Sequence, residues 1–479
     1  MPVWLPELVS IAVLVAVCSG LIGRLPKVEL GHSDAFLRRR FWNWFPLGLT
    51  YAFLYMGRYN LSVSKTEFED LITKADFGDI FGWGSMTYGL AFLLNGPLTD
   101  RLGGRVTILI AAMGSALCNL AMGAVLHFGW TDDLAFKFTI LYCLNMYFQS
   151  FGAVSIVKVN ASWFHVRERG TFGGIFGILI SLGLYLAFDW GGLIARNFGA
   201  LWVFYVPAIV LLFWFVVDFF LVHDAPSATG HIDFETGDAT HGSGALRDVV
   251  KRMLTSRIIL TIAAIEFCSG FLRNAVMQWG RDFGKATGQG ESLVYAHWGL
   301  FMCLAGITGG MVAGLISDRV FGSRRGPVAA FLYAGLTVCA GIIWFAIGSP
   351  AVAWLLVFMS LCFIGVHGML SATASMDFGG KKNAGLATGI IDGCVYGGTA
   401  LQAALLGDML PVGDAAKDPA AWQVWPVAML PAAAVGLLLA STLWNARPKS
   451  SGAVHAVHPV RAEPPMTSQE PAGGRAYQK

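Results

Sequence analysis

Two arginines lie inside long apolar segments, where a positive charge is unusual. Arg58 ends the stretch Tyr51-Ala-Phe-Leu-Tyr55-Met-Gly-Arg58, and Arg273 begins the stretch Arg273-Asn-Ala-Val-Met-Gln278. An arginine at the centre of a bilayer costs about 2.5–3.5 kcal/mol on insertion scales, so it is kept where it meets a cavity, a partner or a ligand. A guanidinium donates two parallel hydrogen bonds to one phosphate or carboxylate group. We therefore predict that these two arginines bind a small-molecule anion.

Further polar side chains extend this candidate site. Tyr51 and Tyr55 share one helical face with Arg58, because successive residues of a helix turn by about 100°. Asp392, in Gly389-Ile-Ile-Asp392-Gly-Cys-Val-Tyr396, is the carboxylate of an otherwise uncharged apolar segment. The predicted substrate-binding residues are Arg58, Arg273, Tyr51, Tyr55, Gln278 and Asp392.

The alternative is that each arginine forms a structural ion pair. Glu266 precedes Arg273 by two helical turns, and Asp392 is another candidate partner. A buried carboxylate near an arginine can also carry a proton, so Glu266 and Asp392 are the candidates for coupling anion binding to protons. The other polar residues of apolar segments are expected to form hydrogen bonds between helices; they are Asn145, Gln149 and His367.

The composition indicates an integral membrane protein. Of the 479 residues, 55% are hydrophobic and only 13% are charged, whereas soluble chains carry about 25% charged residues. The net charge of +3 gives no argument for nucleic-acid binding. The eight cysteines have no metal-type spacing, and neither a phosphate-binding loop nor a nucleophile–base pair is evident. We expect no enzyme activity, no metal and no cofactor.

Apolar runs long enough to cross a bilayer recur along the chain, each needing about 20 residues. Lys and Arg gather in alternate connections, which places those connections and the C-terminus in the cytoplasm of an inner (cell) membrane protein. The first run is preceded by no Lys or Arg, so we expect a retained helix with Met1 outside rather than a cleaved signal. The thirteen runs lie near 4–23, 43–63, 79–99, 106–128, 134–159, 171–190, 200–222, 257–281, 292–317, 327–347, 351–376, 385–407 and 422–444.

These runs define five regions. Residues 1–42 hold the extra helix and a basic cytoplasmic linker, and residues 43–222 form a first six-helix bundle. Residues 223–256 are polar and form a cytoplasmic central loop. A second six-helix bundle spans 257–444, and the tail 445–479 has a composition typical of disorder.

The two bundles share landmarks at a nearly constant offset. Gly96-Pro-Leu-Thr-Asp100-Arg101-Leu-Gly-Gly-Arg105 has an echo in Gly314-Leu-Ile-Ser-Asp318-Arg319, and Arg58 precedes Arg273 by 215 residues. Two six-helix halves with matched Asp-Arg turns resemble the major facilitator superfamily. The resemblance implies an all-α integral membrane fold of two pseudo-symmetric bundles, with substrate bound between them at mid-membrane and access alternating as they rock. It also implies that Asp100, Arg101, Arg105, Asp318 and Arg319 act as a cytoplasmic gate.

A closer resemblance covers roughly residues 40–445. The two arginines, the Asp100–Arg105 turn and Trp163-Phe-His-Val-Arg-Glu-Arg-Gly resemble the organophosphate:phosphate antiporter family, which carries glycerol 3-phosphate and hexose phosphates and includes a bacterial sensor. The resemblance implies that Arg58 and Arg273 hold the phosphate. Two positions depart from the family: a pocket histidine is missing around Ile180 and Ser181, and Phe92 replaces a lysine.

Three functions follow as hypotheses. The first is an antiporter that exchanges an organophosphate for inorganic phosphate. The second is a proton-coupled symporter of another organic anion, and the third is a membrane sensor of sugar phosphates. We expect the protein to be monomeric. Proton dependence of uptake separates the first two, whereas binding without net flux identifies the third.

Overall fold

The computed structural model describes residues 9–12, 14, 16, 30–65, 71–165, 168–236, 250–251, 253–321 and 324–446. For 169–176, 318, 372–385 and 388 only the backbone is described. The chain divides into two compact units, 1–448 and 449–479, and every described residue belongs to the first. Most of the predicted first span and nearly all of the predicted tail therefore lie outside the described residues. The described positions of the first span are helical, and Leu14 packs against Ile178 and Ile307.

The N-terminal half contains six crossings. They are α2 (Asp34–Ser64), α3 (Lys74–Leu102), α4 (Gly104–His127), α5 (Leu134–Trp163), a composite of α6 (Arg169–Tyr185), the π-helical turn η3 (Leu186–Trp190) and α7 (Gly191–Phe198), and α8 (Ala200–Leu221). Thr73 and Asp76 form a capping box that starts α3. Gly103, with φ of 88°, allows the tight turn from α3 to α4 because glycine has no Cβ. The short 3-10 helix η4 (Pro226–Thr229) follows α8.

The C-terminal half repeats this arrangement. Its helices are α10 (Arg257–Ala286), α11 (Leu293–Ala296), α12 (Trp298–Arg319), α13 (Arg325–Phe345), α14 (Ala351–His367) with the π-helical turn η5 (Gly368–Thr373), α15 (Ala374–Met409), the 3-10 helices η6 (Gly413–Lys417) and η7 (Pro419–Gln423), and α16 (Val424–Thr442). Within the described residues, ten helices are long and apolar enough to cross a membrane. The charged α2 and α3, of 31 and 29 residues, occupy the two remaining predicted spans of the twelve-helix body. The predicted all-α membrane fold is confirmed.

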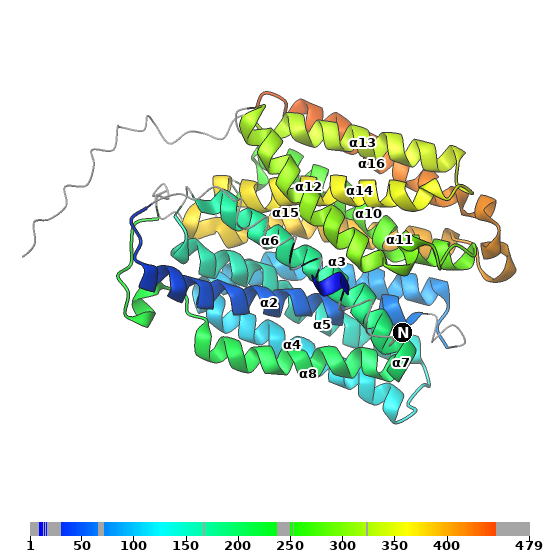
Figure 1. Ribbon diagram of the computed structural model, residues 1–479, viewed down its shortest axis with the longest axis horizontal. Coiled ribbons are helices and arrows are strands. Elements are labelled where there is room, and N and C mark those ends of the chain that lie inside the picture. Colours follow the sequence, from blue (N-terminus) through cyan, green and yellow to red (C-terminus); the bar gives the residue numbers. More distant parts are fainter. Residues whose placement is uncertain are drawn as a thin grey trace, which may run out of the picture. The chain divides into compact units, whose positions relative to one another are not determined.

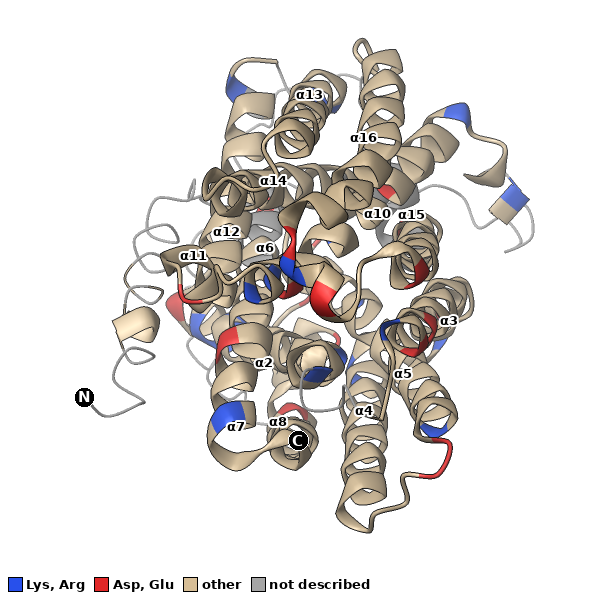
Figure 2. Cartoon of the chain, turned by 90° about the vertical axis from the view of Figure 1, so that its right-hand side faces the viewer, with Lys and Arg blue, Asp and Glu red and all other residues tan. Residues whose placement is uncertain are grey.

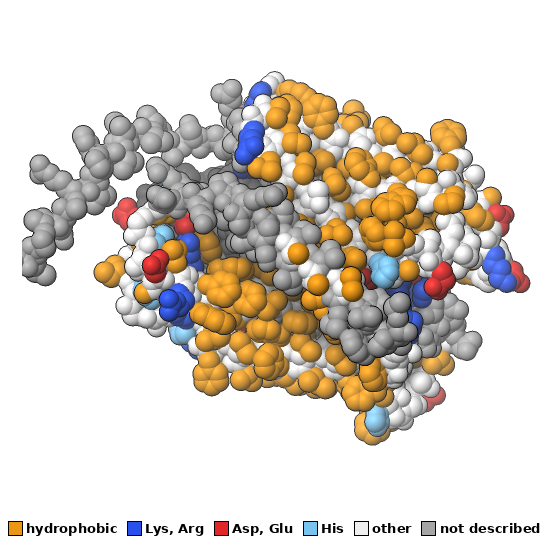
Figure 3. All heavy atoms as spheres, viewed as in Figure 1, with side chains coloured by type: hydrophobic (Ala, Val, Ile, Leu, Met, Phe, Trp, Pro, Cys, Tyr) orange, Lys and Arg blue, Asp and Glu red, His pale blue; other side chains and the backbone are white. Residues whose placement is uncertain are grey.

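The outer surface of this bundle is apolar. Large side chains such as Leu94, Phe213 and Leu438 are 60–68% exposed. On the face shown in Figure 3, hydrophobic side chains cover the middle and charged side chains lie toward the two ends. A monomeric soluble protein rarely exposes such a continuous apolar area, whereas a lipid bilayer covers it.

The two halves meet mainly along two helix pairs, α3 with α15 and α6 with α12 (Figure 1). Glycines bring the backbones of α3 and α15 into direct contact. A Cβ added to Gly89 would lie 2.8 Å from the carbonyl oxygen of Gly393, and one added to Gly389 would lie 2.7 Å from that of Phe92. Small residues permit this close approach within a membrane. The contact fixes the distance between the arginine of one half and the helices of the other.

Candidate functional site

Arg58 is buried in the middle of α2, and its guanidinium has three neutral hydrogen-bond partners. Nε donates to Oε1 of Gln149 at 3.0 Å, Nη2 to the hydroxyl of Tyr88 at 2.8 Å, and Nη1 to the hydroxyl of Tyr396 at 2.6 Å. The Arg58 Cζ atom also lies 4.6 Å from the ring centroids of Tyr55 and Tyr88. These partners come from α2, α3, α5 and α15, so both halves of the protein hold this one guanidinium.

A polar network in the N-terminal half positions Arg58. Gln149 donates through Nε2 to Ser115 and to Asn145, at 3.1 Å in each case. Asn145 in turn donates to the carbonyl oxygen of the residue before Arg58, and Tyr142 donates to the carbonyl of Arg58 itself at 2.9 Å. Buried polar groups satisfied in this way hold one geometry. The prediction that Asn145 and Gln149 form interhelical hydrogen bonds agrees with this arrangement.

Arg273 lies on α10 and faces the same tyrosine. The Cζ atoms of Arg58 and Arg273 are each 5.7 Å from the ring centroid of Tyr396. Arg273 is 8% exposed and Arg58 is 3% exposed. Among the side chains that the structure describes, no carboxylate forms an ion pair with either arginine, and Arg273 has no hydrogen-bond partner. Two buried cations without a described counter-ion are suited to binding an anion, because unpaired buried charge is costly.

The walls around the arginines are aromatic. Tyr51 and Tyr55 lie with ring centroids 5.5 Å apart, as expected from their shared helical face. Phe92 is buried, and its ring lies 4.8 Å from that of Tyr88 and 6.0 Å from that of Tyr396. Position 92, where the family resemblance predicts a lysine, therefore lies beside the arginine site, and here it supplies an apolar surface.

The other predicted site residues lie in the C-terminal half with partners of their own. Gln278 accepts a hydrogen bond from Asn274 at 2.9 Å. Asp392 accepts one from Ser371, and Glu266 lies 3.0 Å from Nδ1 of His367. The structure thus brings Tyr55 against Arg58, whereas the described contacts of Gln278, Glu266 and Asp392 are to residues other than the two arginines.

Charged residues join the two halves at the end of the bundle opposite the N-terminus of α2. Lys65 Nζ contacts Asp282 Oδ2 at 2.6 Å and lies 3.6 Å from the ring centroid of Trp279. The carboxylate of Asp189 in η3 accepts hydrogen bonds from the backbone N–H groups of Gly299 and Leu300, at 2.7 and 2.9 Å. Figure 2 views this end and shows acidic and basic residues gathered near its centre. These contacts hold the two halves together at this end.

The predicted cytoplasmic gate residues lie at the other end of the bundle. Asp100 pairs with Lys158 at 2.8 Å, and the backbone N–H of Arg105 donates to Asp224 at 2.9 Å. Both contacts stay within the N-terminal half. Arg101 and Arg319 are exposed, and the side chain of Asp318 lies outside the described residues. Their role as a gate stays a prediction.

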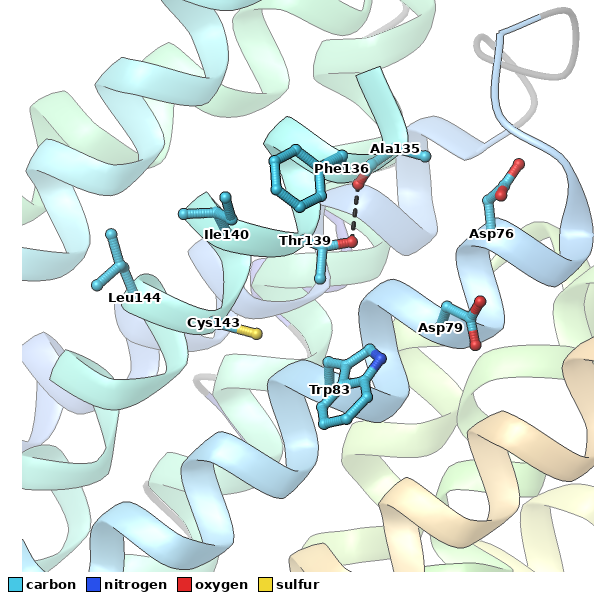
Figure 4. A pocket seen from close by; sticks show the side chains of 9 residues that line it. All are labelled: Asp76, Asp79, Trp83, Ala135, Phe136, Thr139, Ile140, Cys143 and Leu144. Atoms are coloured by element: carbon cyan, nitrogen blue, oxygen red, sulfur yellow. Dashed lines mark hydrogen bonds between the residues drawn. The ribbon is translucent and has the colours of Figure 1, made fainter. Parts of the chain in front are cut away.

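A groove of about 610 Å³ lies between α3 and α5, and Figure 4 shows its lining. Trp83 and Phe136 are 62% and 67% exposed, so the groove faces outward. Its charged residues are Asp76 and Asp79. Two carboxylates without a cation repel an anionic substrate, so this groove is not the anion site.

Sequence reasoning missed Tyr88 and Tyr396 as direct partners of Arg58. Tyr88 stands one helical turn before Phe92, and Tyr396 stands one turn after Asp392. Both positions were visible in the sequence, yet helical spacing says nothing about contact between α3, α15 and α2. Lys65 and Asp282 were missed for the same reason, although they follow Arg58 and Arg273 by seven and nine residues.

Comparisons with known proteins identify the superfamily of the chain. A profile of the Major Facilitator Superfamily matches residues 47–403. The glycerol-3-phosphate transporter of Bacillus subtilis is 25% identical over 439 residues, covering 86% of this chain and 94% of that protein. Membrane sensor protein UhpC of Escherichia coli is 26% identical, with the same two coverages. A probable hexose phosphate transport protein of Chlamydia pneumoniae is 25% identical, covering 84% of this chain and 90% of that protein.

A solved structure shares the fold. The crystal structure of a bacterial homolog of the human lysosomal transporter Spinster has a TM-score of 0.61 and 13% sequence identity. It covers 86% of this chain and 98% of its own length. The named relatives confirm the resemblance to the organophosphate:phosphate antiporter family that the sequence motifs predicted.

Proposed function

This chain belongs to the Major Facilitator Superfamily and is a multi-pass membrane transporter, and on that premise we propose that it exchanges an organophosphate for inorganic phosphate. The substrate would be a glycerol phosphate or a sugar phosphate. The observation that carries the proposal is the pair Arg58 and Arg273, buried around Tyr396 without a described carboxylate partner. Relatives named as glycerol-3-phosphate and hexose phosphate transporters support this substrate class.

Phosphate oxygens would replace the phenols around Arg58. Nη1 and Nη2 now donate to the neutral hydroxyls of Tyr396 and Tyr88. A hydrogen bond from a cation to an anionic oxygen is about twice as strong as one to a neutral acceptor, so phosphate competes for these donors. Arg273 supplies a second guanidinium from the opposite half. One anion bound by both guanidiniums draws the two halves together around it.

The same charges favour exchange over one-way transport. After release, two guanidiniums remain buried without an anion, and an uncompensated charge in a low-dielectric site is costly. The occluded intermediate is then reached more readily with an anion bound than without one. Each half-cycle therefore carries either the organophosphate or phosphate.

Transport in proteoliposomes tests the proposal. Purified protein in vesicles loaded with phosphate should take up radiolabelled glycerol 3-phosphate or glucose 6-phosphate, and vesicles without internal phosphate should not. Uptake driven by a proton gradient and independent of internal phosphate would instead identify the symporter of another organic anion. Arg273→Lys protein serves as the control for site-specific uptake.

A second candidate function is sensing. It rests on the 26% identity to the Escherichia coli membrane sensor protein UhpC, which is no lower than the identity to the named transporters. Binding of a sugar phosphate to purified protein, with neither exchange nor net uptake in vesicles, would favour the sensor.

The membrane orientation is also proposed. The basic ends of α2 and of the central segment would face the cytoplasm, together with the C-terminus, in an inner membrane. Single cysteines introduced next to Lys65 and at Arg101 should react with an impermeant maleimide from outside and from inside, respectively.

The protein is also proposed to act as a monomer. Multi-angle light scattering measures its mass in detergent and checks this.

A further inference from the structure

Three titratable side chains lie near one another in the C-terminal half, and two of them are buried. Glu266 on α10 is 0% exposed, and its Oε2 lies 3.0 Å from Nδ1 of His367 at the end of α14. Asp392 on α15 is 7% exposed and accepts a hydrogen bond from Ser371 in η5. Asp392 lies within electrostatic range of His367, Glu266 and Arg273. The mechanism proposed above uses none of these three groups.

Within the described part of the chain, the carboxylate of Glu266 has a hydrogen-bond partner at only one of its two oxygens. Its second oxygen, Oε1, is buried and has no hydrogen-bond partner among the described residues. Keeping a carboxylate ionised with an unsatisfied buried oxygen is costly. A proton shared between Glu266 and His367 lowers that cost.

The equivalent positions in the N-terminal half do not carry this cluster. The offset of 215 residues that relates Arg58 to Arg273 places Tyr51 at the position of Glu266 and Gly152 at the position of His367. In the N-terminal half a Cβ on Gly152 would lie 3.1 Å from the ring of Tyr51, so the two equivalent positions are also neighbours there. The fold therefore accommodates this contact without a carboxylate or an imidazole, and the carboxylate–imidazole pair is specific to the C-terminal half.

Binding of an anion changes the net charge near this cluster. Glu266 and Asp392 are two buried carboxylates, and Asp392 lies within electrostatic range of Arg273. A phosphate dianion bound to the arginines then adds two negative charges to a buried region, which is unfavourable at low dielectric. We propose that Glu266, His367 and Asp392 form a proton-binding site that takes up about one proton when a phosphate dianion binds at Arg58 and Arg273. The linkage to phosphate rests on the proposed function, whereas the proton-binding site itself does not.

The proton would be shared among the three side chains of the cluster. It comes from solvent and resides on the imidazole of His367 or on the carboxyl groups of Glu266 and Asp392, and no covalent bond of the substrate breaks. The other titratable or charged groups near the cluster come from three helices that pack together. They are Cys268 and Arg273 on α10, Tyr333 on α13, and Cys394 on α15.

Proton uptake on binding can be measured by calorimetry. Glycerol 3-phosphate is titrated into purified protein at about pH 8, where a phosphate ester with a second pKa of about 6 is already a dianion. Titrations in two buffers of different ionisation enthalpy give the protons bound per ligand. We expect about one proton for the native protein and less than half of that for Glu266→Gln and Asp392→Asn. Equal proton uptake in the variants, or none in the native protein despite binding, would overturn the proposal.

A buried carboxylate elsewhere gives the matched control. Asp218 on α8 is 0% exposed and accepts a hydrogen bond from Thr50 at 2.6 Å in the other half. Asp218→Asn removes a carboxylate of the same type outside the cluster, so it should retain the proton uptake that Asp392→Asn loses. Loss of uptake in both variants would mean that the effect is not specific to the cluster, and would count against the proposal.

A ligand-free measurement separates this inference from the proposed function. Infrared difference spectra between about pH 5 and pH 9 report the carboxyl groups that change protonation in that range, which includes the ordinary histidine pKa of about 6.5. Part of the titrating carboxyl band should vanish in Glu266→Gln or Asp392→Asn, and His367→Gln should shift its midpoint. An unchanged band in all three variants refutes the proton-binding site, whether or not glycerol 3-phosphate binds. Failure of both glycerol 3-phosphate and glucose 6-phosphate to bind contradicts the proposed function alone.

Discussion

The hydroxyl of Tyr396 accepts a hydrogen bond from Nη1 of Arg58 at 2.6 Å, and this bond joins α15 to α2 at the centre of the protein. Tyr88 accepts from Nη2 of the same guanidinium at 2.8 Å but lies in the same half as Arg58. The two phenols are thus chemically alike and differ in whether their bond crosses between the halves. This difference makes them a matched pair for experiment.

Tyr396→Phe should weaken the association of the two halves, and Tyr88→Phe should not. A hydrogen bond to a charged group contributes about 1.5–3 kcal/mol, so the conformational equilibrium should change roughly tenfold or more. The rate of maleimide labelling at a cysteine introduced beside Lys65 reports opening of that end. Equal labelling rates in the two variants would show that the Tyr396 bond does not link the halves.

Arg58→Lys and Arg273→Lys should each abolish exchange while the protein still inserts and folds. Lysine keeps the charge and loses the two parallel donors that match a phosphate group. Loss of one bidentate interaction should lower the affinity for glycerol 3-phosphate about 10- to 100-fold. Scintillation proximity binding measures this, with the elution profile in detergent as the check on folding. Normal uptake by both variants would disprove the role of the arginines.

Reversing the charges of Lys65 and Asp282 should preserve function that either single reversal impairs. Their side chains are 8% and 17% exposed, so a like-charged pair at this position is strongly unfavourable. Lys65→Asp and Asp282→Lys should each keep this end open, as measured by cysteine labelling, and the double variant should close again. Were the double variant as open as the single ones, the ion pair would have no part in closure.

Asp189→Asn should also favour opening of this end, by a different interaction. The carboxylate accepts two backbone hydrogen bonds at the start of α12, where the helix dipole stabilises negative charge by about 0.3–2 kcal/mol. The amide lacks the charge and has one acceptor oxygen instead of two. The expected change in the labelling rate is several-fold, smaller than for Lys65→Asp. Asn197, exposed at the end of α7, offers a neutral control position through Asn197→Ala.

Much of the fold followed from the sequence because lipid imposes simple rules. A helix that crosses a bilayer needs a continuous apolar run, so the predicted span 257–281 falls within α10 and the span 200–222 nearly coincides with α8. The two arginines were evident because a cation within such a run is costly and therefore conspicuous. Long connections were harder to place: the run 292–317 covers both α11 and α12, separated by a break at His297.

The sequence by itself determined that this protein is a two-bundle membrane transporter with a guanidinium in each bundle. Only the tertiary structure decided what each guanidinium meets. Tyr88, Gln149 and Tyr396 reach Arg58 from three other helices, and no periodicity within one helix specifies how it turns toward its neighbours. Packing of α3 against α15 through backbone contacts set that rotation. For the same reason Asp392, placed in the sequence as a possible partner of the arginines, proved to hydrogen-bond with Ser371, a residue of its own half.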